Sequence, residues 1–197
     1  MSDRKENIKL ITRTALLLAV TLLFQELRRV LPGVGTLAGT LIIGSLVNLG
    51  LFVAAGIVGW RGSVLIALLT PVVAFLQNHL ALAVLIPFVA AGNIVLVLVF
   101  EWIIRRIGMD KGRGWISVGG ASVLKSLFLW GAIAQFFVRF LLPAQGLPAE
   151  KTAAMTAALS LNFSWPQLVT ALIGGAVALV VLPAVRRALH AEEQLPR

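Results

Sequence analysis

Polar side chains that could bind a ligand lie within long apolar segments of this 197-residue chain. Lys125 lies about ten residues, or about 15 Å, inside the apolar stretch 115–142, too deep for its ammonium group to reach water easily. Gln135 and Arg139 follow on nearly the same face of a helix that turns 100° per residue. Because an unpaired polar group costs several kcal/mol in an apolar environment, each needs a partner or a ligand. We expect the three to line one side of a cavity for an anionic or hydrogen-bond-accepting ligand.

A second group of polar residues lies near the ends of apolar segments. They would converge on one pocket if those ends lie on the same side of the molecule. The alternative is an ordinary belt of polar residues at a membrane surface with an anchoring Trp. This group comprises Gln25, Gln77, Asn78, His79, Asn162, Trp165 and Gln167. We interpret Glu26, Arg28 and Arg29 as surface ion pairs and leave them outside the site.

Two asparagines lie midway along apolar segments, Asn48 in the second and Asn93 in the fourth. Either could simply join helices through hydrogen bonds, although we include Asn93 among the binding candidates. For Lys125 the alternative to a ligand-binding role is a pair with one of these amides or with a carbonyl group at a helix end.

The elements that must position these residues are membrane-spanning helices. The chain is 59% apolar and 13% charged, with a mean hydropathy of +0.96, a composition that excludes an ordinary soluble domain. We predict an all-α membrane protein, a single domain of six transmembrane helices joined by short connections. The predicted spans are 9–31, 37–59, 62–79, 82–104, 115–142 and 165–185, with a short helix near 151–161 in the longest connection.

The distribution of basic residues orients these spans. A cytoplasmic N-terminus assigns twelve Lys and Arg to the cytoplasm and four to the other side, as the positive-inside rule requires. Both termini are therefore predicted to be cytoplasmic and the ligand pocket extracytoplasmic. The twelve are Arg4, Lys5, Lys9, Arg13, Arg61, Arg105, Arg106, Lys111, Arg113, Arg186, Arg187 and Arg197; the four are Arg28, Arg29, Arg139 and Lys151.

Several functional classes lack the residues that they need. There is no phosphate-binding loop, no paired carboxylates within a span and no cysteine, so we expect no catalytic site, no metal site and no intrinsic cofactor. Gly119 to Ser122 faintly resembles a serine protease loop, but neither histidine lies mid-span to act as its base. The net charge of +9 comes mainly from clusters beside apolar segments, which argues against a nucleic-acid partner.

Several motifs follow one another along the chain: Ala15-Leu-Leu-Leu-Ala19, Thr70-Pro71-Val-Val-Ala-Phe75, Gly92-Asn93, Lys125, and Ser164-Trp-Pro-Gln-Leu-Val-Thr-Ala171 ahead of Gly174-Gly175. In this order they resemble the motifs of the substrate-binding S components of energy-coupling-factor (ECF) vitamin transporters. The resemblance implies a multi-pass protein of a prokaryotic plasma membrane that captures a vitamin or related micronutrient outside the cell. It implies as partners a membrane scaffold subunit, the T component, which docks on Ala15 and Ala19, and two cytoplasmic ATPases. It leaves the vitamin unassigned.

Two other functional classes stay open. A membrane scaffold or sensor would use the buried polar residues only to join its helices. A stand-alone small carrier would transport without ATPases, but the chain shows neither an internal repeat nor a buried acid for ion coupling.

Overall fold

The apolar segments form helices along nearly the whole chain. A computed structural model describes residues 2–30, 36–110 and 112–194, and this part of the chain contains no strand. Five of its helical segments are long and apolar enough to cross a membrane. The predicted end of the first span at residue 31, Lys111 and Arg197 lie outside the described residues. The helices are α1 (Ser2–Glu26), η1 (Leu27–Arg29), α2 (Leu37–Leu76), η2 (Ala83–Leu85), α3 (Ile86–Ile107), α4 (Arg113–Leu129), η3 (Trp130–Leu141), η4 (Pro143–Gln145), α5 (Ala149–Asn162) and α6 (Trp165–Gln194).

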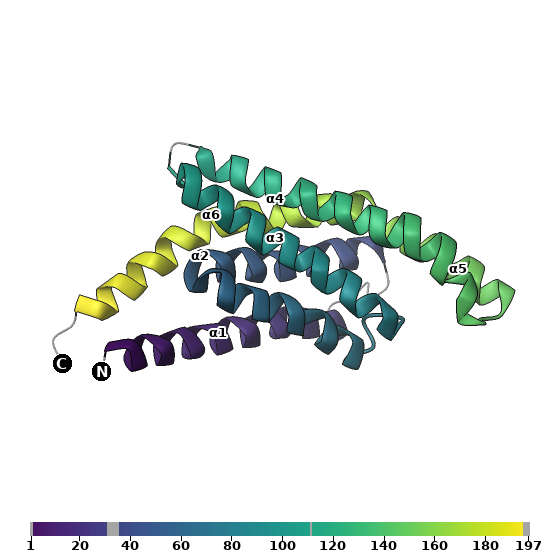
Figure 1. Cartoon of the computed structure of the whole chain (residues 1–197), viewed down its shortest axis with the longest axis horizontal. Helices are drawn as coiled ribbons and strands as arrows, with labels where there is room; N and C mark the ends of the chain where they lie inside the picture. The colour runs from purple at the N-terminus through teal and green to yellow at the C-terminus, as the bar shows by residue number, and fades with distance from the viewer. Residues whose placement is uncertain (1, 31–35, 111, 195–197) are drawn as a thin grey trace.

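Helix α2, with 40 residues, is divided at Gly59. The backbone there has φ 67° and ψ −173°, a conformation that glycine adopts without steric cost because it has no Cβ. The residues before and after it form two arms, 37–58 and 60–76, and the second arm runs back beside the first (Figure 1). The sequence predicts this turn at Trp60-Arg61-Gly62, immediately after its position in the structure.

The main core lies between the two arms of α2 and helices α3, α4 and α6. Leu51, Ile66 and Leu182 are fully buried there, and the rings of Phe52 and Phe100 meet edge to face with centroids 4.8 Å apart. Helix α1 packs along α2 and leaves much of its own surface exposed. The core thus joins α2, α3, α4 and α6, the four helices that carry the mid-span polar residues.

A smaller core lies at the end of the bundle that is far from both termini. Leu85, Ile133, Phe137 and Leu159 form its centre, so that α5 packs against η3 (Figure 1). The segment η3 is π-helical, and the amide of Leu142 that ends it donates to the Phe137 carbonyl oxygen, five residues back, at 2.8 Å. We call this end of the molecule the α5 end, and the opposite one the terminal end.

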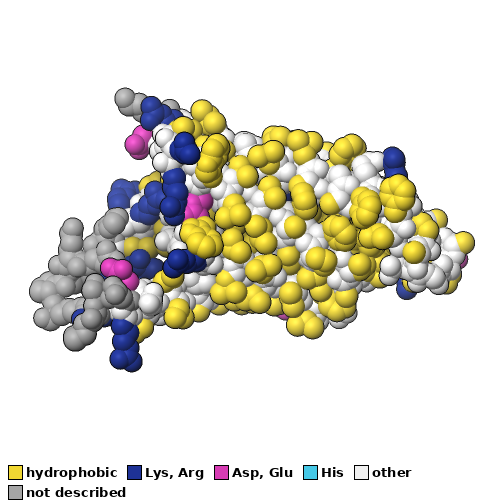
Figure 2. All heavy atoms as spheres, viewed as in Figure 1, with side chains coloured by type: hydrophobic (Ala, Val, Ile, Leu, Met, Phe, Trp, Pro, Cys, Tyr) yellow, Lys and Arg dark blue, Asp and Glu magenta, His cyan; other side chains and the backbone are white. Residues whose placement is uncertain are grey.

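Charged side chains gather at the terminal end. Figure 2 shows Lys and Arg crowded there, a broad hydrophobic band over the middle of the molecule, and few charges at the α5 end. The exposed basic residues near the terminal end include Arg4, Lys5, Arg61, Arg105 and Arg106. An apolar band between polar ends is the surface expected of helices that cross a bilayer.

Candidate ligand-binding site

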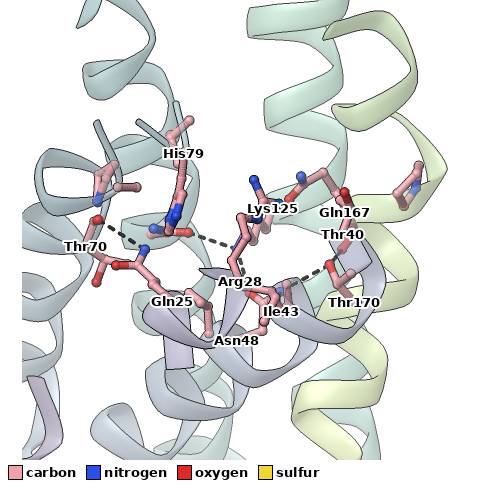
Figure 3. A pocket seen from close by; sticks show the side chains of 17 residues that line it. Gln25, Arg28, Thr40, Ile43, Asn48, Thr70, His79, Lys125, Gln167 and Thr170 are labelled. Carbon is pink, nitrogen blue, oxygen red and sulfur yellow. Dashed lines mark hydrogen bonds between the residues drawn. The ribbon is translucent and has the colours of Figure 1, made fainter. Parts of the chain in front are cut away.

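Lys125 of α4 is 3% exposed and lies among polar side chains from three other helices. Its Nζ donates to Asn48 Oδ1 of α2 at 2.6 Å and to Asn93 Oδ1 of α3 at 2.9 Å. Both amides that the sequence offers as partners therefore hold the same ammonium group. Figure 3 shows this group and the side chains around it.

Asn48 is in turn held in one orientation. Its Nδ2 donates to the Gly44 carbonyl oxygen at 2.9 Å and to Thr170 Oγ1 of α6 at 3.2 Å. The Thr170 hydroxyl donates to the Gln167 carbonyl oxygen at 3.1 Å. Because both protons of the amide nitrogen are used, the amide oxygen must point toward Lys125. The network ties α2, α3, α4 and α6 together around one charge.

A cavity of about 170 Å³ opens beside this network. Its walls come from every helix that crosses the middle of the bundle. It is far larger than the roughly 10–15 Å³ that one water molecule needs. The lining residues are Gln25, Arg28, Thr40, Ile43, Gly44, Val47, Asn48, Thr70, Pro71, Ala74, His79, Val89, Asn93, Lys125, Pro166, Gln167 and Thr170. We call it the inner cavity.

A second cavity, of about 420 Å³, adjoins the first at the α5 end. The two share Arg28, Thr40, His79 and Gln167 in their walls. The rest of this outer cavity is mainly apolar and comes from α5, from the start of α2 and from the segment between α2 and α3. Its apolar residues include Leu80, Leu85, Met155, Ala158, Leu159, Leu161 and Phe163, and Asn162 is a polar member. Helix α5 therefore covers the approach to Lys125 from that end.

His79 lies just after α2, in the wall between the cavities. The pKa of its imidazole is lowered from 6.5, first by burial and then by the positive charge of Arg28, with Glu26 acting in the opposite direction. The imidazole is therefore neutral at pH 7, when it can both donate and accept a hydrogen bond.

Six of the eleven predicted binding residues line one or both cavities. They are Gln25, His79, Asn93, Lys125, Asn162 and Gln167. Gln25 also joins α1 to the second arm of α2, because its Nε2 donates to the Thr70 carbonyl oxygen at 3.2 Å. His79, just after α2, and Gln167, near the start of α6, line the same cavities, so these two ends of apolar segments converge on one pocket.

The sequence places Gln135 and Arg139 on one cavity wall with Lys125, whereas the structure places them elsewhere. Neither lines the inner or the outer cavity, and Arg139 is exposed. The reason is η3, whose hydrogen bonds reach five residues back and give each residue less rotation than the 100° of an α-helix. Between Lys125 and Arg139 this difference in rotation accumulates, so the two side chains point to different faces of the helix.

Three other predicted residues also line neither of these cavities. Asn78 is exposed in the turn after α2 and has a φ of 60°. Gln77 is half-buried, and its Oε1 has no partner among the described residues. Trp165 is exposed in an apolar surface groove beside Trp130, where it resembles the interfacial anchor that was the alternative interpretation.

The residue that the sequence interpretation missed is Arg28. The sequence suggests a surface ion pair for Arg28, but Glu26 pairs with Arg29, whose Nε lies 3.2 Å from the Glu26 carboxylate. Arg28 instead lines both cavities. The available signal was its spacing of three residues from Gln25, which places both side chains on one helix face. Asn48, Thr40 and Thr170 complete the polar wall.

Elsewhere in the structure, Ala15 and Ala19 lie exposed on one stretch of α1, near the exposed Ile11, Leu16 and Leu23. In the part of the chain that the structure describes, no group of three or more His, Asp or Glu side chains is arranged to hold a metal ion.

Comparison with known proteins identifies the family. The family model of the ECF transporter, substrate-specific component, matches residues 9–186, which is most of the chain. Neither the curated proteins nor the solved structures contain a match. The resemblance seen in the sequence motifs is confirmed, and the chain belongs to the family of substrate-specific components of ECF transporters.

Proposed function

We propose that this chain captures a vitamin or a related micronutrient outside a prokaryotic cell and releases it inward through an ECF complex. The single observation that carries the proposal is Lys125, held by two amides at the wall of a polar cavity inside an apolar bundle. A protein whose polar residues only joined helices would have no need of an accessible cavity beside them. The chain has no catalytic role in this proposal, because partner ATPases hydrolyse the ATP.

The topology of the proposal has six crossings of the plasma membrane. They are α1, the two arms of α2, α3, α4 continued by η3, and α6. The terminal end, where most of the Lys and Arg lie, faces the cytoplasm (Figure 2). Both cavities then lie toward the extracytoplasmic side, and α5 covers them from outside.

The partners in the proposal are a T component and two cytoplasmic ATPases. Ala15 and Ala19 provide the docking surface for the T component, because small exposed residues four positions apart let another helix approach closely. The exposed Ile11, Leu16 and Leu23 add apolar contact area along the same helix.

The experiment that tests ligand capture is native mass spectrometry of the full chain, purified in detergent from cells grown in rich medium. We expect a bound small molecule, or one that binds when a panel of vitamins is added. Repeated absence of any bound molecule would contradict the proposal and favour a membrane scaffold or sensor.

Docking is tested separately with Ala15→Trp combined with Ala19→Trp. We expect the double variant to bind ligand normally but to lose co-purification with the T component and uptake in cells. The matched control is Val180→Trp, which adds the same ring at a 77% exposed site on α6. Normal assembly of the double variant would contradict the assigned surface.

A further inference from the structure

Lys125 has no counter-ion in the folded chain. Among the described residues no carboxylate lies within 4 Å of its Nζ, and its two hydrogen-bond partners are neutral amide oxygens. An ammonium group has three donors, so one remains for a third acceptor. A charge buried in an apolar bundle is stabilised chiefly by an opposite charge, and the protein supplies none at this position.

Arg28 is in the same situation at the boundary between the two cavities. Its side chain is half-buried, and its guanidinium group has neither a hydrogen-bond partner nor an ion pair within the described ranges. The five N–H donors of this group form a planar fork that matches the two oxygens of a carboxylate or phosphate. No Asp or Glu of the described chain lines either cavity. The pocket therefore presents two unpaired cations and no acid.

Neutral hydrogen-bond donors beside these cations also favour a ligand group that is rich in acceptors. Asn93 lines the inner cavity, and the one hydrogen bond found for its side chain in the described structure uses the oxygen, which accepts from Lys125. In Figure 3, Arg28, His79 and Lys125 surround one space. An acceptor-rich group placed there would meet donors from η1, α3 and α4.

The two cavities differ in size and in lining. The inner one, of about 170 Å³, holds Lys125 and most of the amides and hydroxyls. The outer one, of about 420 Å³, is walled mainly by apolar side chains such as Met155, Leu159 and Phe163. Their combined size falls within the roughly 300–1,000 Å³ typical of small-molecule sites. The two cavities are neighbours, because Arg28, Thr40, His79 and Gln167 line both, and a molecule of this combined size would contact both sets of lining residues.

The geometry points to an anionic ligand with two unlike parts, an inference that rests on the proposed function. A carboxylate or phosphate group lies against Lys125 in the inner cavity, close to Arg28. A larger and mainly apolar body fills the outer cavity beneath α5. Both parts are needed, because the inner cavity alone is small and the outer cavity alone offers no fully buried charge.

The test uses pairs of molecules that differ only in the acid. The full chain in detergent is titrated by calorimetry with nicotinate and nicotinamide, biotin and biotinamide, lipoate and lipoamide, and pantothenate and panthenol, and with pyridoxal phosphate and pyridoxal as the phosphate pair. We expect an acid that binds at least about tenfold more tightly than its neutral partner, since an interaction with a charged partner is lost. Any molecule that co-purifies should likewise carry a carboxylate or phosphate.

Two substitutions distinguish the loss of a positive charge from a loss of correct folding. Lys125→Gln keeps a hydrogen-bond donor and removes the charge, and Arg28→Gln does the same at a half-buried site where misfolding is not expected. Both should reduce the preference for the acid by about tenfold or more. The matched control is Arg139→Gln, which removes an exposed cation outside both cavities and should leave the preference unchanged.

Two outcomes would overturn the inference. Tight binding of a neutral or cationic vitamin such as riboflavin or thiamin, unaffected by Arg28→Gln, would leave the proposed function standing and refute the anionic ligand. Binding of none of the compounds, together with the absence of any co-purified molecule, would overturn the proposed function and this inference with it.

Discussion

Gly174 of α6 packs closely against α2 beside Asn48, one of the residues that hold Lys125. A Cβ added there would lie 2.5 Å from the Ser45 carbonyl oxygen, 2.7 Å from the Leu49 nitrogen and 2.9 Å from Asn48 Cβ. Ordinary van der Waals contact begins at 3.4 Å, so Gly174→Ala should push α6 away from α2 by about 1 Å in a core packed at crystal density. Two of the three contacts are with backbone atoms, which cannot rotate aside as a side chain can.

Two opposing effects determine how much stability the Gly174→Ala variant loses. Overpacking of a close-packed core costs about 1–3 kcal/mol, and the higher helix propensity of alanine returns at most about 1 kcal/mol. We therefore expect a net loss of about 1–2 kcal/mol in the free energy of unfolding. Ligand affinity should fall as well, because Asn48 is one of the displaced residues and holds Lys125.

The assay is unfolding of the purified protein in detergent, followed by tryptophan fluorescence during titration with sodium dodecyl sulfate. The matched control is Gly119→Ala on α4, where an added Cβ meets no atom within 4 Å. That variant should be as stable as the native chain or up to about 1 kcal/mol more stable. The reasoning would be refuted if Gly174→Ala retained native stability or if the control lost as much.

Three further predictions concern other buried or interfacial groups. Ser122→Ala should leave thermal stability equal or higher, because the fully buried hydroxyl that it removes has no described partner, and a loss above about 1 kcal/mol would contradict this. Arg186→Met should lower stability by about 1.5–3 kcal/mol, because Nη2 of Arg186 donates to the Gly56 carbonyl oxygen of another helix at 2.9 Å. Arg187→Met, which removes only a bond within α6 to Pro183, should change stability little in the same unfolding assay. The lowered pKa of His79 means that the unfolded chain takes up a proton first as pH falls below 6.5, so stability should decline between 6.5 and the lower folded value and then level off. The melting temperature measured across this range should fall less in His79→Gln, and an equal fall in both proteins would show that His79 is not responsible.

The sequence was sufficient to predict the helical architecture. Apolar segments of spanning length must form helices in a bilayer, because only a helix satisfies its own backbone hydrogen bonds there. The predicted turn at Trp60-Arg61-Gly62 lies next to the observed one at Gly59. The need to pair a deep charge was also readable, since Lys125 could be satisfied by only a few residues, and the structure uses both Asn48 and Asn93. These conclusions depend on energies too large to be overridden by local detail.

The position of side chains beyond Lys125 could not be predicted. The change from α- to π-helix near Trp130 has no clear signal in the sequence, yet it removes Gln135 and Arg139 from the cavity wall. Arg28 could not be assigned from the sequence, because Glu26 has two basic neighbours and the sequence does not say that Arg29 is the one that pairs with it. Such choices depend on differences of a kcal/mol or less between exposed ion pairs.

The turn at Gly59 couples the positions of the two arms of α2 in the bilayer. A connection of one residue leaves no slack, so under the proposed topology neither arm can slide along the membrane normal without drawing the other with it. Trp60 and Arg61, exposed at the tip, then set the depth of both arms together, because an aromatic ring and a basic group favour the membrane surface.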